Sequence, residues 1–533
     1  MQILDAPRPV KLIDPNTVGP ASLQQNFRAQ VGKISRESGF FLAGSLFTTA
    51  AGYFFRIFLA RTLGAEALGI YALGMTIVGF LGILAALGLP QAAVRFVAAY
   101  NATGHVNLVH KFLTRSLLLL LTTNLVLGAA IAMNSRWIVA IYHAPTLGPY
   151  LILFCAIMLL GSVNAFLGQT LTGYKDVSRR AVITNFVGTP LNMILVIALI
   201  AAGSGLRGYI VAQVWSAFVV LVLLAIAVWR TAHSTSAPVN GSPASLSKGV
   251  ASFAGATMSM ELLGFLLSQG DKVMIGIFLN ARHLGLYAVA GALVSFVPVV
   301  LQAINQIFAP TIADLHATGQ IALLSRLFHK LAKWTFASTF PGACVLIVFS
   351  RNFMHLFGPD FESGWPVLVI GTVGQLINCA VGSVGFMLLM SGNERKLLKV
   401  QIAVAGFVIA ANYFLIPRWG ITGAALASAL ANGLLNLWCL REVRTNLGVF
   451  PFTRSYVKLV LPCVITTLSL VFVRRLDLSA VFSIPPLLGS VVLAYTIFFS
   501  VGFLVAADDD DRMVTSAILK RCRAFFQIEP QEI

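Results

Sequence analysis

Long apolar runs follow one another along almost the whole chain, and they restrict its fold more than any other feature. About 14 stretches each supply roughly the 20 apolar residues that a helix needs to cross a bilayer core. Only 11% of the 533 residues are charged, against roughly 25% in soluble domains. We therefore predict an all-α polytopic membrane protein with about 14 transmembrane helices.

The distribution of basic residues predicts how these helices are oriented. A net charge of +18 in a soluble domain would suggest nucleic-acid binding, but Lys and Arg also collect in the cytoplasmic loops of membrane proteins. With the N-terminus inside, the inner segments hold 27 of the 37 Lys and Arg residues, and the outer loops hold eight. We expect both termini in the cytoplasm and no nucleic-acid partner.

Two segments of the chain form an internal repeat. Residues 56–73 read RIFLARTLGAEALGIYAL, and residues 272–289 read KVMIGIFLNARHLGLYAV. Aligned without a gap, they share a Leu, Ala, Leu, Gly, Tyr, Ala pattern at a constant offset. A second, shorter match between the two halves pairs GLRG at 205–208 with GITG at 420–423. Because six predicted helices separate the copies, both halves share one orientation, an arrangement that places substrate sites between two lobes.

The repeat and the polar stretches divide the chain into six segments. The stretch TAHSTSAPVNGSPASLSKG between the halves is rich in Ser, Pro and Ala, as flexible linkers are. The predicted segments are a cytoplasmic N-terminal tail (1–37), an N-lobe of helices 1–6 (38–230), a cytoplasmic linker (231–249), a C-lobe of helices 7–12 (250–445), helices 13 and 14 (446–506) and a cytoplasmic C-terminal tail (507–533).

Two basic residues lie within the predicted spans at equivalent positions of the repeat. They are Arg56 in the first half and Lys272 in the second. A charge inside a bilayer costs several kcal/mol and faces a cavity or a partner. Two cations on opposite lobes would flank one anionic site. The alternative is that both long side chains extend to the outer headgroups.

Acidic and amide side chains add candidate roles inside the spans. Asp271, too short to reach the headgroups, is a candidate to pair with Lys272 or Arg56, or to bind a coupling cation. Glu261 lies 11 residues before Lys272, roughly 16 Å along the same helix face, and is a candidate for proton exchange. Gln302 and Asn305 are candidate cavity residues, with hydrogen bonding between helices as the alternative.

Several functional classes are excluded by the absence of their motifs. The sequence has no GxxxxGK[ST] nucleotide-binding loop, no recognisable Ser/His/Asp arrangement and no metal-ligand spacing. We expect no enzymatic activity, no cofactor and no metal. Transport would then be driven by an ion gradient or would follow the concentration gradient of the substrate itself.

Three stretches carry a resemblance to a known family. FFRIFLARTLGAEALGIYAL (54–73), LGLPQAAVRFVAAY (87–100) and DKVMIGIFLNARHLGLYAV (271–289) resemble the oligosaccharide flippases, the Wzx-type polysaccharide exporters. This family belongs to the MOP superfamily, with the MATE antiporters and the lipid II flippase MurJ. The resemblance covers roughly residues 38–506.

The resemblance implies two parallel-repeat six-helix lobes around a central cavity, plus two C-terminal helices. It implies transfer of an undecaprenyl-pyrophosphate-linked oligosaccharide from the cytoplasmic to the periplasmic leaflet of a bacterial inner membrane, for surface or exopolysaccharide synthesis. By analogy, Arg56 and Lys272 would contact the headgroup. Asp271 and Glu261 would balance charge or couple transport to H⁺ or Na⁺. Membrane lipids, a polysaccharide polymerase and chain-length proteins are the expected partners.

Three alternatives stay open at this stage. A MATE-like cation or drug antiporter would be expected to have twelve helices, and the apolar runs at 456–473 and 484–506 argue against it. A lipid II flippase fits the same fold, although the sequence resembles the polysaccharide branch more closely. A non-transporting scaffold in a polysaccharide-synthesis complex would keep its activity without the buried charges.

Overall fold

The structure is a computed structural model that describes residues 20–234, 246–475 and 484–505. Within these ranges all regular structure is helical, as the composition predicts. Helix α1 begins at Pro20, so part of the predicted N-terminal tail is helical and continuous with the first span. Most of the predicted linker and the tail at 507–533 lie outside the described residues. The boundaries of the six predicted segments stay predictions.

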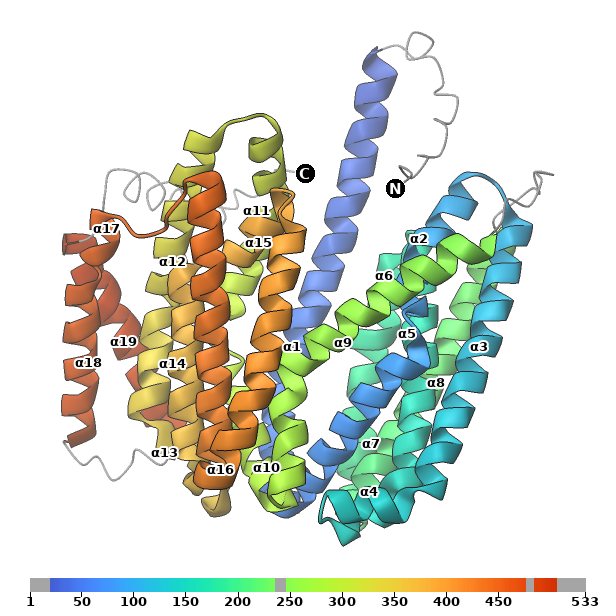
Figure 1. The fold of residues 1–533 in the computed structure, drawn as a ribbon, viewed down its shortest axis with the longest axis horizontal. Coiled ribbons are helices and arrows are strands. Elements are labelled where there is room, and N and C mark those ends of the chain that lie inside the picture. The colour runs from blue at the N-terminus through green and yellow to red at the C-terminus, as the bar shows by residue number, and fades with distance from the viewer. Residues whose placement is uncertain (1–19, 235–245, 476–483, 506–533) are drawn as a thin grey trace, which may run out of the picture.

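The helices follow one another with short connections (Figure 1). In chain order they are α1 (Pro20–Ala86), α2 (Leu89–Ala102), α3 (Val106–Met133), α4 (Ser135–Ile141), η1 (Pro145–Tyr150), α5 (Leu151–Gly173), α6 (Val177–Ala181), η2 (Val182–Gly188), α7 (Thr189–Ala201), α8 (Gly205–Ser234), α9 (Leu246–Phe278), α10 (Ala281–Val294), α11 (Val299–Ala317), α12 (Ile321–Val348), α13 (Ser350–His355), η3 (Pro359–Gly364), α14 (Trp365–Val381), α15 (Val384–Met390), α16 (Glu394–Leu447), α17 (Arg454–Val457), α18 (Val460–Arg475) and α19 (Ile484–Val505).

By length and composition, eleven helices of the described residues could cross a membrane, or up to twelve if the bent pair α10 and α11 forms one span. Helix α16 has 54 residues, which straight would measure about 80 Å, far more than a bilayer core of about 30 Å. It is not straight, because Gly420 inside it has a positive φ of 57°. Helix α1 is likewise broken at Gly64, with φ 78°. Counting their arms separately brings the total near the predicted 14, a number that stays a prediction.

Matched backbone breaks support the internal repeat. Gly64 interrupts α1, and its counterpart Asn280 caps α10 by accepting a hydrogen bond from the backbone N–H of His283. The paired glycines Gly205 and Gly420 both have positive φ, 49° and 57°. The structure also reveals a pair absent from the sequence alignment above. Ala-Thr-Gly ends α2 at 102–104 and α11 at 317–319, with φ of 73° and 71° at the two glycines.

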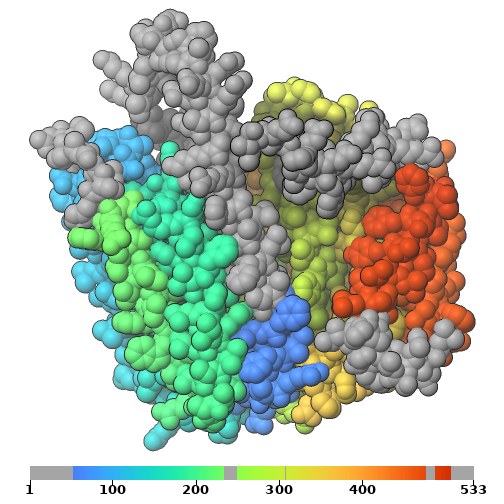
Figure 2. Space-filling model, turned by 180° about the vertical axis from the view of Figure 1, so that it is seen from behind, coloured from blue at the N-terminus to red at the C-terminus, as the bar shows by residue number. Residues whose placement is uncertain are grey.

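The helices form two bundles with a pair of helices attached outside. We call α1 to α8 the first bundle and α9 to α16 the second bundle. Figure 2 shows the two from behind, with α2 to α8 on one side and the helices from α11 onward on the other. The last two helices, α18 and α19, pack on α12, where Val345, Leu470 and Leu487 are buried together. This is the position of the predicted helices 13 and 14.

The two bundles touch most closely where α1 turns at Gly64. A Cβ atom added to Gly69 would lie 1.6 Å from the carbonyl oxygen of Ala281, and one added to Gly285 would lie 1.9 Å from that of Ala65. The contact is reciprocal, because Ala65 and Gly69 are the repeat counterparts of Ala281 and Gly285. Small residues let helices approach this closely in membranes. Towards the other end most helices of the two bundles diverge (Figure 1), whereas the first part of α9 packs on α2.

This contact predicts that larger side chains at the two glycines will force α1 and α10 apart. The double variant Gly69→Leu/Gly285→Leu should lower the thermal unfolding midpoint of the purified protein, at a cost of roughly 1–3 kcal/mol per site from overpacking. Gly161→Leu/Gly406→Leu is the matched control, because both glycines are exposed in helices with nothing within 4 Å of an added Cβ. Equal midpoints for the two double variants would contradict the prediction.

Candidate functional site

A cavity of about 620 Å³ lies between the two bundles, and both sequence-predicted cations line it. Its walls come from both arms of α1, from α9 and α10, and from single residues of α8 and the α13–η3 connection. Arg56 lies on the first arm of α1 and Lys272 on α9, so one cation comes from each bundle. The two side chains line the same space. The repeat alignment had predicted this juxtaposition.

The neighbouring residues Asp271 and Lys272 serve different parts of the structure. Lys272 faces the cavity, where its Nζ donates a hydrogen bond to Gln269 Oε1 at 2.7 Å. Asp271 accepts hydrogen bonds from the hydroxyl groups of Tyr287 and Ser428, the latter at 3.1 Å. Among the described residues, no ion pair joins Asp271 to Lys272 or Arg56. The carboxylate is therefore held inside the second bundle, and the cation is directed into the space between the bundles.

Each cation is held by a residue one helical turn before it. The Arg56 guanidinium lies over the ring of Tyr53, 5.6 Å from its centroid, while Gln269 binds the Lys272 ammonium. Tyr53 and Gln269 are themselves repeat counterparts, at the same offset as the two cations. Gln269 draws Lys272 away from the end of α9 at Phe278, which argues against extension to the headgroups beyond that end. The sequence analysis did not identify Tyr53 and Gln269, although the constant offset of the internal repeat relates them to each other as it relates Arg56 to Lys272.

A second pair of counterparts, Tyr71 and Tyr287, anchors each bundle beside the cavity. The Tyr71 hydroxyl and the Gln213 side-chain oxygen are 3.0 Å apart, and Tyr287 binds Asp271. Gln213 and Ser428 stand at the same distance after their paired glycines, Gly205 and Gly420. The two halves differ at one point, because the counterpart of Asp271 is Phe55. The carboxylate therefore belongs to the second bundle alone.

The remaining predicted site residues lie away from the lining of this cavity. Glu261 is half-buried on α9 and faces Gln91 of α2, across the interface of the bundles. Gln302 is exposed on α11. Asn305, on the same helix, is buried, and its side-chain oxygen has no hydrogen-bond partner among the described residues. Of the six candidates, the cavity brings together Arg56 and Lys272.

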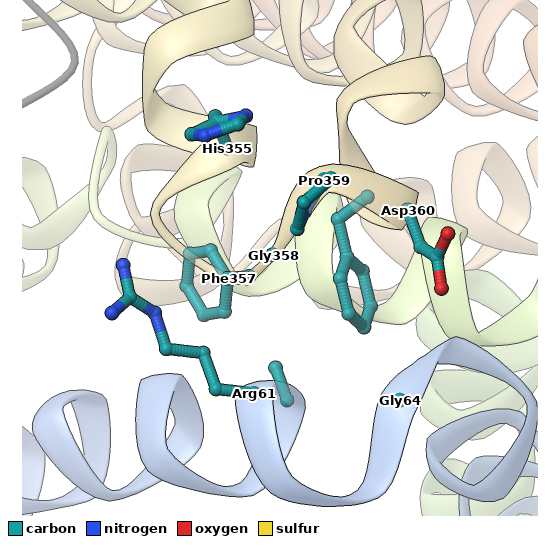
Figure 3. Close-up of a pocket in the computed structure, with 9 residues that line it drawn as sticks. Arg61, Gly64, His355, Phe357, Gly358, Pro359 and Asp360 are labelled. Carbon is teal, nitrogen blue, oxygen red and sulfur yellow. The ribbon is translucent and has the colours of Figure 1, made fainter.

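A smaller pocket of about 330 Å³ marks the end where the bundles meet (Figure 3). Its lining combines Arg61 and Gly64 of α1 with the segment from His355 to Phe361 of the second bundle. Arg61 Nε donates a hydrogen bond of 2.8 Å to the carbonyl oxygen of Leu356, at the end of α13. A cation at a helix C-terminus is favourable. This bond fastens the first bundle to the second beside the glycine contact.

Comparison with known proteins assigns the chain to a family. The family model described as "Polysaccharide biosynthesis protein" matches residues 34–316, which is more than half of the chain. The chain belongs to the polysaccharide biosynthesis protein family. This assignment agrees with the resemblance carried by residues 54–73, 87–100 and 271–289.

Two curated relatives from the archaeon Haloferax volcanii are similar to this member of the polysaccharide biosynthesis family. The "Probable flippase AglR" is 22% identical over 429 residues, covering 79% of this chain and 86% of that protein. The "Probable low-salt glycan biosynthesis flippase Agl15" is 23% identical over 169 residues, covering 32% of this chain and 36% of that protein.

Solved structures show the same fold at low identity. The lipid II flippase MurJ in an inward closed conformation aligns with a TM-score of 0.70 and 13% identity, covering 87% of this chain and 98% of MurJ. An inward-facing multidrug resistance MATE transporter of the MOP superfamily aligns with a TM-score of 0.59 and 15% identity, covering 74% and 94%. This family member therefore has the same fold as MurJ and this MATE protein, and its candidate spans make it a multi-pass membrane protein.

Proposed function

We propose that the protein is a flippase for an undecaprenyl-pyrophosphate-linked oligosaccharide repeat unit. It moves this lipid from the cytoplasmic to the periplasmic leaflet of a bacterial inner membrane, with both termini in the cytoplasm, and supplies surface or exopolysaccharide synthesis. The observation that carries the proposal is the shared cavity of Arg56 and Lys272, with one cation from each bundle. The family match supports the link to polysaccharide synthesis.

The chemistry of a pyrophosphate-linked lipid explains why a membrane protein would keep two cations there. A diphosphate loses its hydration when it enters an apolar region, and an unpaired ion in such a region is very costly. Two fixed cations offset that cost by charge-assisted hydrogen bonds to the phosphate oxygens. A volume of about 620 Å³ is within the usual range of ligand pockets. The tyrosines Tyr71 and Tyr209 add a polar aromatic wall.

The arrangement of the bundles supports an alternating-access mechanism. Two bundles related by a parallel repeat can rock about a site between them. In this conformation the bundles are joined beside Gly64, and towards the other end they diverge except where α9 packs on α2. We propose that the substrate headgroup enters from the diverging side and leaves after the joined end has separated.

Two carboxyl groups are our candidates for coupling this movement to an ion gradient. Asp271 has Tyr287 and Ser428 as its hydroxyl partners, and a hydroxyl can turn its lone pairs towards a cation or its proton towards a carboxylate. Glu261 faces Gln91 between the bundles, where protonation would alter a contact between α9 and α2. The coupling ion would be H⁺ or Na⁺. Gln302 and Asn305 lie outside the lining of this cavity, and contact with another part of the substrate stays a proposal for both.

A lipid II flippase is the second candidate, because the fold of MurJ covers most of this chain. Both substrates would carry the same pyrophosphate, so the two cations do not separate these functions. A cation or drug antiporter of the MATE type fits less well, because the cavity presents Arg56 and Lys272 to its ligand. We further propose that a polymerase and chain-length proteins receive the transported lipid.

The flippase proposal predicts which lipid accumulates when the gene is deleted. Complete polyprenyl-linked repeat units should build up on the cytoplasmic leaflet, and surface polymer should be lost. Mass spectrometry of extracted lipids, combined with a leaflet-sidedness assay, measures both and identifies the sugar. Restoration by the wild-type gene is the control. Accumulation of lipid II would favour the second candidate, and normal lipids with normal polymer would contradict both.

The headgroup role predicts the effect of removing the two cations. Arg56→Gln/Lys272→Gln should reduce export by more than about 100-fold at unchanged protein level, since each lost charge-assisted hydrogen bond costs roughly 1.5–3 kcal/mol. Arg136→Gln/Arg418→Gln is the matched control, because it removes one exposed arginine from each bundle. Normal export by the first variant would refute the headgroup role.

The coupling role predicts that neutral isosteres lose the response to an ion gradient. Asp271→Asn should leave transport independent of the coupling gradient, because an amide keeps the shape of the carboxylate without its charge. Glu261→Gln tests the second carboxyl group in the same way. The control is Asp360→Asn, which affects only an exposed carboxylate 3.6 Å from Arg282. Transport is measured in vesicles with and without imposed H⁺ and Na⁺ gradients, and an unchanged response rejects the role of that residue.

A further inference from the structure

The helix pair α10 and α11 is interrupted beside the cavity. The segments Ala281–Val294 and Val299–Gln306 meet at an angle of 52°. Pro298 has no N–H group, and the N–H of Phe296 donates to Leu293 instead of to Ala292. The carbonyl of Ala292 is therefore released from the helical ladder. A backbone carbonyl at membrane depth needs another donor, because lipid supplies none.

Two hydroxyl groups supply hydrogen bonds to this carbonyl, one from Ser295 beside the break at 2.6 Å and one from the other bundle. The hydroxyl of Tyr53, on the first arm of α1, donates to the carbonyl oxygen of Ala292 at 2.8 Å. It also lies 2.9 Å from the hydroxyl oxygen of Ser295, which itself donates to Ala292. The ring of Tyr53 stacks on Phe296 with 3.5 Å between centroids. One side chain of the first bundle thus completes the hydrogen bonding of the break in the second bundle.

The same ring also supports a cation of the cavity. The guanidinium of Arg56 lies 5.6 Å from the ring centroid of Tyr53, a distance at which a cation is attracted to an aromatic face. The residue in the equivalent place of the other half, Gln269, holds Lys272 but stays within its own helix. Tyr53 therefore differs from its counterpart, because it contacts both a cavity cation and the opposite bundle.

We infer that Tyr53 is a positioning residue that holds Arg56 with its ring and ties the first bundle to the α10–α11 break with its hydroxyl. The inference rests on the proposed function, because it takes Arg56 as a contact of the anionic headgroup. An anion bound at Arg56 competes with the Tyr53 ring for the guanidinium. Anion binding therefore alters the hydrogen bond that the Tyr53 hydroxyl donates to the carbonyl oxygen of Ala292. Headgroup binding and the angle of the break are then linked through one side chain.

Two substitutions separate the ring from the hydroxyl. Tyr53→Phe keeps the aromatic face and removes the bond to Ala292, whereas Tyr53→Leu removes both. Tyr413→Phe and Tyr413→Leu are the matched controls, because Tyr413 is an exposed tyrosine on α16 whose ring lies beside those of Phe278 and Phe414. All variants are prepared as the full chain in lipid nanodiscs.

Two measurements follow the two roles. Calorimetric titration with inorganic pyrophosphate reports the positioning of Arg56. Spin labels at Thr103→Cys and Thr318→Cys, with the six native cysteines replaced by serine, report the separation of the bundles. These two threonines are exposed counterparts that follow α2 and α11.

We expect Tyr53→Phe to bind pyrophosphate as the wild type does but to lose the change in label distance that pyrophosphate produces. Tyr53→Leu should also weaken pyrophosphate binding by about two- to fivefold, the value of a cation–π contact at an exposed site, because Arg56 is exposed. Wild-type affinity in Tyr53→Leu would overturn the positioning of Arg56. If pyrophosphate changes the label distance in Tyr53→Phe as it does in the wild type, the proposed link between the first bundle and the α10–α11 break is wrong.

Failure of the proposed function has a different signature. If the wild type binds no pyrophosphate, or if Arg56→Gln binds it equally well, the headgroup assignment fails, and the positioning role fails with it. The label distances without ligand still test the tie in that case. Identical distance distributions in Tyr53→Phe and the wild type would then reject it.

Discussion

The contact of two glycines with two carbonyl groups holds the two bundles together at one end of the molecule. Gly69 and Gly285 let α1 and α10 approach until each backbone touches the other, and neither glycine could carry a methyl group without moving a helix. Away from this end most helices of the two bundles separate, while the first part of α9 stays packed on α2. The cavity lies in that separation, and Arg61 fastens the same end to Leu356.

The charges follow from the same arrangement. Successive residues of a helix point about 100° apart, so Asp271 and Lys272 can face different neighbours although they are adjacent in the chain. The carboxylate faces two hydroxyls inside the second bundle, and the ammonium faces Arg56 across the cavity. The cavity thus keeps its positive charge, which a direct ion pair with Asp271 would have cancelled.

The sequence alone predicted the features that depend on periodicity and on the repeat. Run length predicted a helical membrane protein, and a constant offset predicted that Arg56 and Lys272 would face one space. The partners of Asp271 escaped prediction, because Tyr287 and Ser428 come together only after three helices have packed. Gln302 and Asn305 lie off the cavity lining, because the rotation of a helix about its axis decides which polar residue faces which neighbour. The paired Ala-Thr-Gly stretches are present in the sequence, but only the matching positive φ angles of their glycines identify them as part of the internal repeat.

The closed end also affects how the protein would experience the membrane voltage. In the proposed alternating-access mechanism, most of the potential drop would fall across the short stretch around Gly69 and Gly285, because touching backbones conduct ions less well than an open cavity does. Moving one elementary charge through a drop of 100 mV is worth about 2.3 kcal/mol. In the proposed orientation, with a negative cell interior, an anionic headgroup carried outwards through that stretch would move down the electrical gradient. The same two glycines that bring the helices together would then also be the place where the voltage acts on the cargo.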